Sequence, residues 1–158
     1  MLTLLAGVSR DPLPRQIDFD PWQCDLDAQS AWKNFGGLSL EEAYTKFCPI
    51  PESYQEDFMF MGSAAFLYYF PVIDEYLRCA TPCDEWDDCQ ADILGSCVAA
   101  QFDWKGARIP PELRFRIEGL CEYILSNLSR FASSEPDREK IKKSWAQVQG
   151  KLKMTIHT

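Results

Sequence analysis

The sequence of 158 residues contains a single histidine, His157, at its penultimate position. A catalytic pair of serine or cysteine with histidine requires a histidine that a third group holds rigidly, whereas chain ends commonly fray. A glycine-rich phosphate loop is missing too, because Gly36 and Gly37 lack an adjoining lysine and a preceding predicted strand. These absences predict a protein that is not an enzyme and that binds no cofactor.

Long apolar runs are also missing, since no stretch approaches the roughly 18 apolar residues of a membrane span. The apolar residues 2–8 lack a basic region before them and meet Arg10 and Asp11 directly, so we expect no signal peptide. A chain that is not exported stays in a reducing compartment, where its seven cysteines are expected to be thiols. The sequence therefore predicts a soluble, cytoplasmic protein.

Paired CxxC motifs, the usual source of zinc ligands on tight turns, are absent. The closest approach to a metal site is a group of four cysteines, separated by three, five and seven residues: Cys79, Cys83, Cys89 and Cys97. Two of them lie on a predicted apolar helix face, and unpaired cysteine is commonly a small buried apolar residue. We therefore expect these cysteines to pack in the core and to bind no metal.

Positive charge is scarce in the first two-thirds of the chain. Residues 1–104 contain 18 acidic and 5 basic residues, whereas residues 105–158 contain 6 acidic and 11 basic ones, for an overall net charge of −8. An acidic surface of this kind repels nucleic acid and anionic membranes and attracts basic proteins. The charge predicts a basic protein partner, or simply serves solubility.

Alternating runs of β-branched residues, which are typical of strands, are lacking, and only residues 1–8 and 154–157 could pair as edge strands. Helical spacing of apolar residues instead predicts helices within residues 28–35, 39–47, 63–79, 81–104, 110–131 and 134–152. Ser39 and Glu42 have the spacing of a capping box, Gly36 and Gly37 are suited to a helix end, and Pro71 predicts a kink or a break.

The length fits one domain, and an apolar share of 46% supplies a core without disulfides or metal. We predict an all-α fold in which residues 1–158 form a single compact domain of about five to seven amphipathic helices. Residues 1–24, which are rich in proline, form an irregular lead-in, and residues 25–152 form the helical core. Trp86, Trp104 and Ile117 are predicted core residues because each lies on an apolar helix face.

Two groups of acidic residues are candidates for partner binding. Asp84, Asp88 and Asp92, with Asp87 beside them, lie opposite an apolar face formed by Trp86, Cys89, Ile93, Cys97, Ala100 and Trp104. They form either a solvated face or a surface for a cationic partner. Glu56 and Asp57 stand among the aromatic residues and methionines of Tyr54–Gly62. Such a mixture occurs at buried helix junctions, which we favour, and at interaction hot spots.

Three segments, Leu38–Phe47, Tyr54–Gly62 and Ala65–Ile73, share an aromatic core pattern. With this pattern, residues 38–78 resemble small uncharacterised helical proteins of bacteria, some of which are similar to immunity proteins of polymorphic or contact-dependent toxin systems. The resemblance implies a bacterial cytosolic inhibitor. It rests on a core pattern rather than on a site motif, so it transfers no functional residue.

The sequence thus favours a binding function. We expect an immunity-type protein that binds and blocks a cognate basic toxin through its acidic surface, without contacting nucleic acid or membrane. One alternative is a helical adaptor or chaperone that holds a partner's helix in a groove. Another, the least favoured, is a hydrolase that works through two carboxylates facing one cleft. The oligomeric state is left open.

Overall fold

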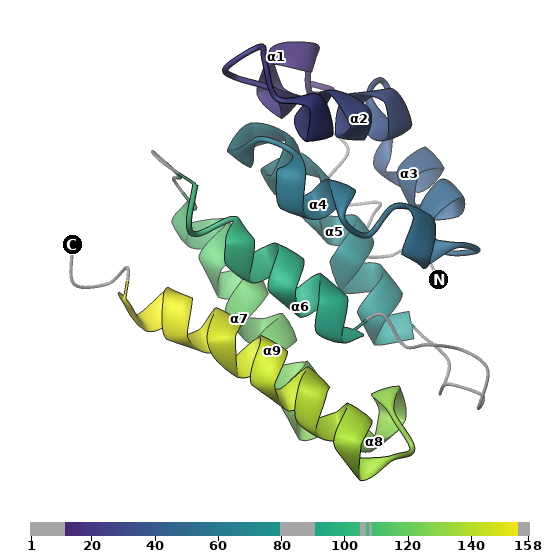
Figure 1. Ribbon diagram of the computed structural model, residues 1–158, viewed down its shortest axis with the longest axis vertical. Helices are drawn as coiled ribbons and strands as arrows, with labels where there is room; N and C mark the ends of the chain where they lie inside the picture. The colour runs from purple at the N-terminus through teal and green to yellow at the C-terminus, as the bar shows by residue number, and fades with distance from the viewer. Residues whose placement is uncertain (1–11, 80–90, 105–106, 108, 155–158) are drawn as a thin grey trace. The chain divides into compact units, whose positions relative to one another are not determined.

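The computed structural model describes residues 12–79, 91–104, 107 and 109–154. All regular secondary structure within these ranges is helical, which confirms the predicted all-α fold (Figure 1). The chain divides into two compact units, residues 1–76 and residues 77–158. The single domain expected from the chain length stays a prediction.

The N-terminal unit contains short helices and most of one long helix. Its elements are α1 (Gln16–Phe19), α2 (Leu26–Phe35), α3 (Leu40–Phe47), a 3-10 turn (Pro51–Ser53), α4 (Asp57–Phe60) and α5 (Ser63–Cys79), whose last residues belong to the second unit. Helix α2 packs against both α1 and α4. The predicted irregular lead-in therefore contains one helical turn, α1, followed by a tight turn into α2.

Local capping explains where these helices begin. The Asp25 side chain accepts hydrogen bonds from the backbone N–H groups of Asp27 and Ala28, at 3.0 and 3.2 Å, and so starts α2. The predicted capping box at the start of α3 is confirmed, because Ser39 and Glu42 exchange hydrogen bonds of 2.8 and 3.2 Å. The short range of the Ser39–Glu42 contacts made this capping box readable in the sequence, whereas the Asp25 cap was not predicted.

The core of the N-terminal unit is aromatic. Phe35 lies at its centre, with ring centroids 5.4 Å from Phe58 and 5.8 Å from Tyr69. The Tyr69 hydroxyl is 2.8 Å from the backbone carbonyl oxygens of both Phe35 and Leu38, so its proton can bond either of them. This hydroxyl ties α5 to the turn that follows α2, where Gly37 has a φ of +77°.

Helix α5 continues unbroken through Pro71. Proline cannot donate to the carbonyl four residues earlier, which belongs to Leu67. Leu67 is 42% exposed, so water can reach that turn, whereas Pro71 and the residues on either side of it are buried. Burial of this apolar segment outweighs the missing hydrogen bond. Of the two predicted outcomes, a break into two helices is wrong, and a kink at Pro71 stays a prediction.

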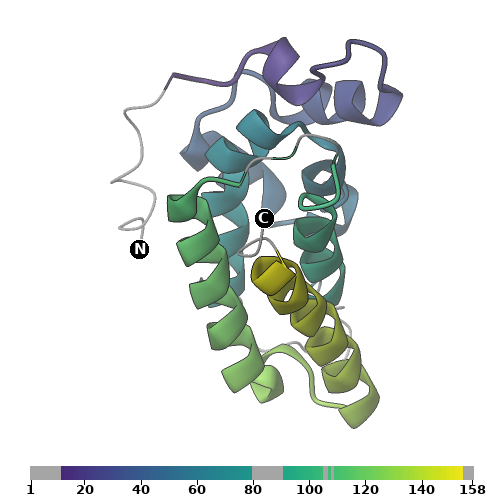
Figure 2. The same cartoon turned by 90° about the vertical axis from the view of Figure 1, so that its left-hand side faces the viewer.

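The C-terminal unit is built around its last helix. Its elements are α6 (Ala91–Ala100), α7 (Pro111–Ser126), α8 (Leu128–Phe131) and α9 (Glu135–Met154). Helix α9 packs along α6 and α7, as Figure 2 shows. The Trp145 indole donates to the Ala91 carbonyl at 2.8 Å, and Lys151 pairs with Asp103 further along, so α6 and α9 run in the same direction.

Helix α6 and helix α9 approach closely at Gly95. A Cβ atom at this position would overlap the Ser144 hydroxyl and would lie 2.9 Å from the Trp145 indole nitrogen. Trp145 is fully buried, and the Ser144 hydroxyl donates to the Asp92 carbonyl at 2.5 Å. The missing side chain of Gly95 therefore permits the tryptophan and the serine of α9 to bond the backbone of α6.

The apolar helix faces predicted for the C-terminal unit agree with the observed burial in two helices and differ from it in a third. The faces expected for α7 and α9 are confirmed, including Ile117, which is fully buried. Helix α7 ends at Ser126, and the helix predicted to reach Phe131 continues as the separate turn α8. On α6 the buried residues are Ala91, Leu94, Gly95, Cys97, Val98 and Ala99.

The apolar face predicted for the region of α6 is therefore mostly wrong. Of its members, Cys97 is buried, whereas Ile93, Ala100 and Trp104 are only half-buried; Trp86 and Cys89 lie outside the described residues. Helix α6 ends at Ala100, so Trp104 no longer follows its periodicity. No helix in the described part of the chain combines the length and the apolar character that crossing a membrane requires.

Candidate functional site

The structure places one member of the predicted acidic stripe. Asp92 is half-buried in the first turn of α6, and its backbone carbonyl accepts the hydrogen bond from Ser144. Asp84, Asp87 and Asp88 lie outside the described residues. Their role as a binding face stays a prediction.

The second predicted pair, Glu56 and Asp57, divides between solvent and core. Glu56 is exposed, whereas Asp57 is buried and accepts a 2.8 Å hydrogen bond from the Asn34 amide. Burial raises the pKa of Asp57 above its ordinary value of 3.8, although the Asn34 bond and the nearby Lys46 charge oppose the shift. The burial agrees with the helix junction favoured for this segment, and a binding role for the pair stays a prediction.

A cleft between α1 and α2 lies in the described part of the N-terminal unit. It has a volume of about 350 Å³. Its walls are formed by Gln16, Ile17, Asp20, Gln23 and Gln29. Volumes near 300 Å³ are at the lower limit for small-molecule pockets, so this cleft is suited to a single long side chain or a ligand of similar size.

Asp20 is the charged residue of the cleft wall. Its side chain is held in place because one carboxylate oxygen, Oδ2, accepts from the Asp25 N–H at 3.3 Å and from the Gln29 amide at 3.2 Å. The residue is only 3% exposed, yet its other oxygen, Oδ1, has no hydrogen-bond partner among the described residues. A buried carboxylate oxygen left in this condition is unusual, because burying an unsatisfied polar atom costs free energy.

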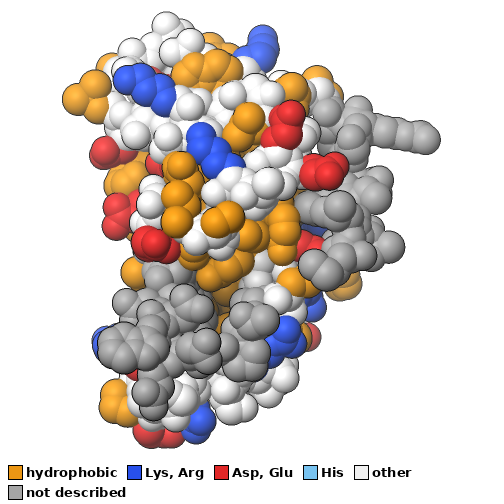
Figure 3. Space-filling model, turned by 90° about the vertical axis from the view of Figure 1, so that its right-hand side faces the viewer, with side chains coloured by type: hydrophobic (Ala, Val, Ile, Leu, Met, Phe, Trp, Pro, Cys, Tyr) orange, Lys and Arg blue, Asp and Glu red, His pale blue; other side chains and the backbone are white. Residues whose placement is uncertain are grey.

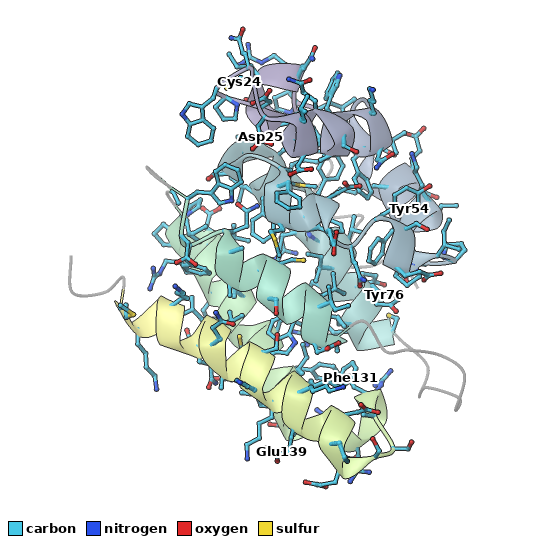
Figure 4. All side chains as sticks on the ribbon, viewed as in Figure 1. Cys24, Asp25, Tyr54, Tyr76, Phe131 and Glu139 are labelled. Atoms are coloured by element: carbon cyan, nitrogen blue, oxygen red, sulfur yellow. The ribbon has the colours of Figure 1, made fainter. Side chains whose placement is uncertain are left out.

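The turn that joins α1 to α2 shapes the cleft. The Gln23 N–H donates to the Asp20 carbonyl at 3.1 Å, and Gln23 has a φ of +60°, in the left-handed region that non-glycine residues rarely adopt. Figure 4 labels Cys24 and Asp25 at this turn, at one end of the unit. Residues in sparsely populated backbone regions cluster at functional sites, and Gln23 lies three residues from the unsatisfied Asp20 carboxylate.

Exposed apolar side chains accompany the cleft along the chain. In the described part of the sequence, eight large apolar residues are exposed, and four of them lie within residues 13–26: Leu13, Ile17, Trp22 and Leu26. Trp22 is 51% exposed and Leu26 is 79% exposed. Figure 3 shows one face of the molecule, on whose upper part hydrophobic side chains lie between charged ones. Aromatic side chains are enriched in protein-binding surfaces, where apolar contacts form the centre and polar residues the rim.

A second hollow, of about 270 Å³, lies between α7 and α9 in the C-terminal unit. Its walls are formed by Pro111, Arg114, Phe115, Glu118, Glu122, Gln149, Leu152 and Lys153. Phe115 is 78% exposed at its edge. The Arg114 guanidinium crosses between the two helices and donates to the Leu152 carbonyl at 2.6 Å. This hollow is therefore a mixed surface, with one exposed aromatic ring among charges of both signs.

The two units differ in charge. Residues 1–76 contain 12 acidic and 4 basic residues, so the unit that contains the α1–α2 cleft carries a net charge of −8. Residues 77–158 contain 12 of each, for a net charge of zero. Within the described residues, no group of three or more histidine, cysteine, aspartate or glutamate side chains could hold a metal ion.

Comparison with protein-family models, with curated proteins and with solved structures finds no match to this chain. The function is therefore argued from the site. Sequence reasoning missed Asp20 and its cleft, because a short turn among prolines has no periodicity that would single out one buried aspartate. The usable signal was the run of apolar residues, Leu13, Ile17, Trp22 and Leu26, between acidic ones.

Proposed function

We propose that this protein is an immunity-type binding protein that blocks a basic protein toxin by covering it with the cleft face of its N-terminal unit. The cleft face is defined as the α1–α2 cleft together with Leu13, Trp22 and Leu26, exposed residues of the same segment of chain. The observation that carries the proposal is the buried, unsatisfied Asp20 oxygen in a cleft whose wall includes the exposed Ile17, on a segment that also exposes Trp22. Tryptophan is enriched among hot-spot residues, which cluster in desolvated pockets.

Charge supports the same assignment. The net charge of −8 on residues 1–76 would attract a basic partner over a distance limited by salt screening, about 8 Å at physiological ionic strength. Such attraction speeds encounter, while apolar contacts at Trp22 and Leu26 would slow dissociation. An inhibitor of this kind acts by occupying the surface of its target and needs no chemistry of its own.

The test uses two exposed residues of the cleft face and one matched residue elsewhere. Trp22→Ala and Leu26→Ser truncate exposed apolar side chains, and Phe115→Ser does the same at the α7–α9 hollow. Affinity capture from the native host with the wild-type chain, followed by mass spectrometry, identifies candidate partners. We expect the genuine partner to be basic, to be lost with Trp22→Ala and Leu26→Ser, and to be retained with Phe115→Ser.

The immunity function is tested separately in cells. Expression of the captured partner alone should stop growth, and co-expression of the wild-type chain should restore it. Trp22→Ala should restore growth less well than Phe115→Ser at equal protein levels. A partner that is harmless when expressed alone would contradict the immunity function, and equal rescue by the two variants would contradict the cleft face as the binding surface.

A second function has one observation in its favour. The α7–α9 hollow with its exposed Phe115 could receive the apolar residues of a partner helix, as in an adaptor or a chaperone. The same variants discriminate the two functions. Loss of the captured partner with Phe115→Ser, and its retention with Trp22→Ala and Leu26→Ser, would favour the adaptor.

A further inference from the structure

We infer that the α1–α2 cleft binds the guanidinium group of an arginine side chain, which donates a hydrogen bond to the Oδ1 atom of Asp20. This inference rests on the proposed function and names the group that the partner would insert. The partner would supply an arginine, and Asp20, which the sequence did not single out, would accept its hydrogen bond.

The position of Asp20 is the first step of the argument. Its Oδ2 atom is already occupied by the Asp25 N–H and the Gln29 amide, at 3.3 and 3.2 Å. Those two bonds hold the carboxylate in one orientation. Asp20 belongs to the wall of the cleft, and its Oδ1 atom is buried there without a donor among the described residues. A donor that reaches this oxygen from the cleft would satisfy it while the two bonds to Oδ2 remain.

The rest of the cleft wall is rich in hydrogen-bond acceptors. Gln16, Gln23 and Gln29 each carry an amide oxygen, and the Gln29 amide nitrogen already donates to Asp20. That bond uses the nitrogen of the Gln29 amide as a donor and does not involve its oxygen, which is an acceptor. The cleft wall therefore contains one charged acceptor, the Asp20 carboxylate, and neutral acceptors, the glutamine amide oxygens. A ligand with several donors in one plane could bond to both kinds.

Arginine matches this arrangement better than lysine does. Its guanidinium has five N–H donors in a rigid plane and is weakly hydrated, whereas the lysine ammonium is compact and strongly hydrated. The aliphatic part of the side chain can pack against Ile17, the apolar member of the wall. The volume of about 350 Å³ suits one side chain of this length. The net charge of −8 on residues 1–76 favours a cation over a neutral amide.

The experiment uses defined probes and the full chain. N-acetyl-arginine methylamide is titrated into the 15N-labelled protein, and the backbone signal of Gln23 and the side-chain amide signals of Gln16 and Gln29 are followed by NMR. We expect saturable shifts at roughly millimolar probe concentration, the range for a ligand of this size. The lysine counterpart should bind at least about threefold more weakly than the arginine probe. The citrulline counterpart, which is neutral and isosteric with arginine, should bind at least about tenfold more weakly.

Two variants and one control assign the binding to Asp20. Asp20→Asn keeps a carbonyl oxygen that can accept from the Asp25 N–H but removes the charge, so we expect about tenfold weaker binding of the arginine probe. Gln16→Met, at an exposed position of the wall, should weaken binding less. Asp27→Asn removes an exposed acidic residue of α2 that does not line the cleft, and it should leave binding unchanged.

The outcomes separate this inference from the proposed function. Equal binding of the arginine and citrulline probes, or binding unaffected by both Asp20→Asn and Gln16→Met, would overturn the guanidinium site. The cleft face would then still stand if Trp22→Ala and Leu26→Ser lose the captured partner. If Asp20→Asn fails to fold, Gln16→Met and the probe series decide. Shifts that do not saturate with any probe would also overturn the inference.

Discussion

At the scale of single residues, the buried polar groups of the N-terminal unit can be tested one at a time. Asp20, Asp57 and Tyr69 all belong to this unit and are buried. Each is held by a partner distant along the chain or across a turn, such as Asn34 for Asp57 and the Phe35 and Leu38 carbonyls for Tyr69. Replacing one of them tests a single contact rather than the whole core.

The buried carboxyl of Asp57 should make stability depend on pH. Because folding raises the pKa of Asp57 above 3.8, the folded chain keeps this proton at pH values where the unfolded chain has lost it. The associated stability is fully present below the unfolded pKa and is lost as pH rises through the folded pKa. Asp57→Asn removes this dependence while an amide oxygen can still accept from Asn34.

We therefore expect the free energy of unfolding of Asp57→Asn, relative to wild type, to increase from about pH 3 to about pH 7. Urea denaturation followed by circular dichroism at each pH measures the difference. A difference that is constant over this range, or that falls with pH, would show that folding does not raise the pKa of Asp57.

The Tyr69 hydroxyl should stabilise the turn after α2. Tyr69→Phe leaves the carbonyls of Phe35 and Leu38 without this donor, so we expect a loss of about 1–3 kcal/mol in the free energy of unfolding. Burial also raises the pKa of Tyr69 well above its usual value, so the hydroxyl stays protonated throughout the measurement. Tyr68→Phe, on the half-exposed neighbour, should cost less. Equal losses in chemical denaturation would contradict the assignment.

At the scale of elements, local residues decide where helices begin, and a close approach decides how two of them pack. The Ser39 capping box and the Asp25 cap start α3 and α2 from within their own turns. The pairing of α6 with α9 depends instead on Gly95, whose neighbours Ser144 and Trp145 lie on the other helix. A glycine in α6 is therefore required by packing, against its low helix propensity.

Gly95→Ala and Gly150→Ala form a matched pair. A Cβ atom at Gly95 would meet Ser144 and the rigid Trp145 ring, so we expect a loss of about 1–3 kcal/mol in the free energy of unfolding. Gly150 lies in α9, and a Cβ atom added there would have no neighbour within 4 Å, so alanine should gain about 0.5–1 kcal/mol through helix propensity. Thermal denaturation should move the two midpoints in opposite directions. Shifts of the same sign would disprove the close approach.

At the scale of the whole molecule, the two units differ in net charge, and this difference would affect association with the proposed basic partner. The N-terminal unit carries the entire net charge of −8, and the C-terminal unit is neutral. Long-range attraction to a basic partner would therefore arise mainly from the N-terminal unit, and it would weaken with added salt.

Charge reversal tests which acidic surface guides the partner. Replacing three exposed acidic residues of the N-terminal unit, Glu41, Glu52 and Glu56, by lysine should slow association with the captured partner and reduce its salt dependence. Dissociation should change less, because charges at the margin of an interface act mainly on encounter. Stopped-flow or surface-plasmon kinetics measures both rates.

The comparison variant replaces Asp84, Asp88 and Asp92, the stripe predicted from the sequence, by lysine. A larger effect on the association rate in this variant than in the N-terminal one would identify that stripe as the binding face. Unchanged kinetics in both variants would show that the acidic charge serves solubility alone.

The sequence by itself determined the features that depend on neighbours along the chain. The helical class follows from the recurring spacing of apolar residues, and the start of α3 follows from Ser39 and Glu42, three residues apart. The buried faces of α7 and α9 also agreed with the sequence, because each carries a long and regular apolar pattern. The net charge needs no structure at all.

Only the tertiary structure decided which face of α6 is buried and where the candidate site lies. Helix α6 is apolar on most sides, so its own pattern left several orientations open until Trp145, 54 residues away, bonded the Ala91 carbonyl. Asp20 looked like one acidic residue among many in a proline-rich lead-in. Its significance comes from burial and from an oxygen without a partner among the described residues, which are properties of three-dimensional packing. Contacts between residues far apart in the sequence have no periodicity, and that is why the sequence did not reveal them.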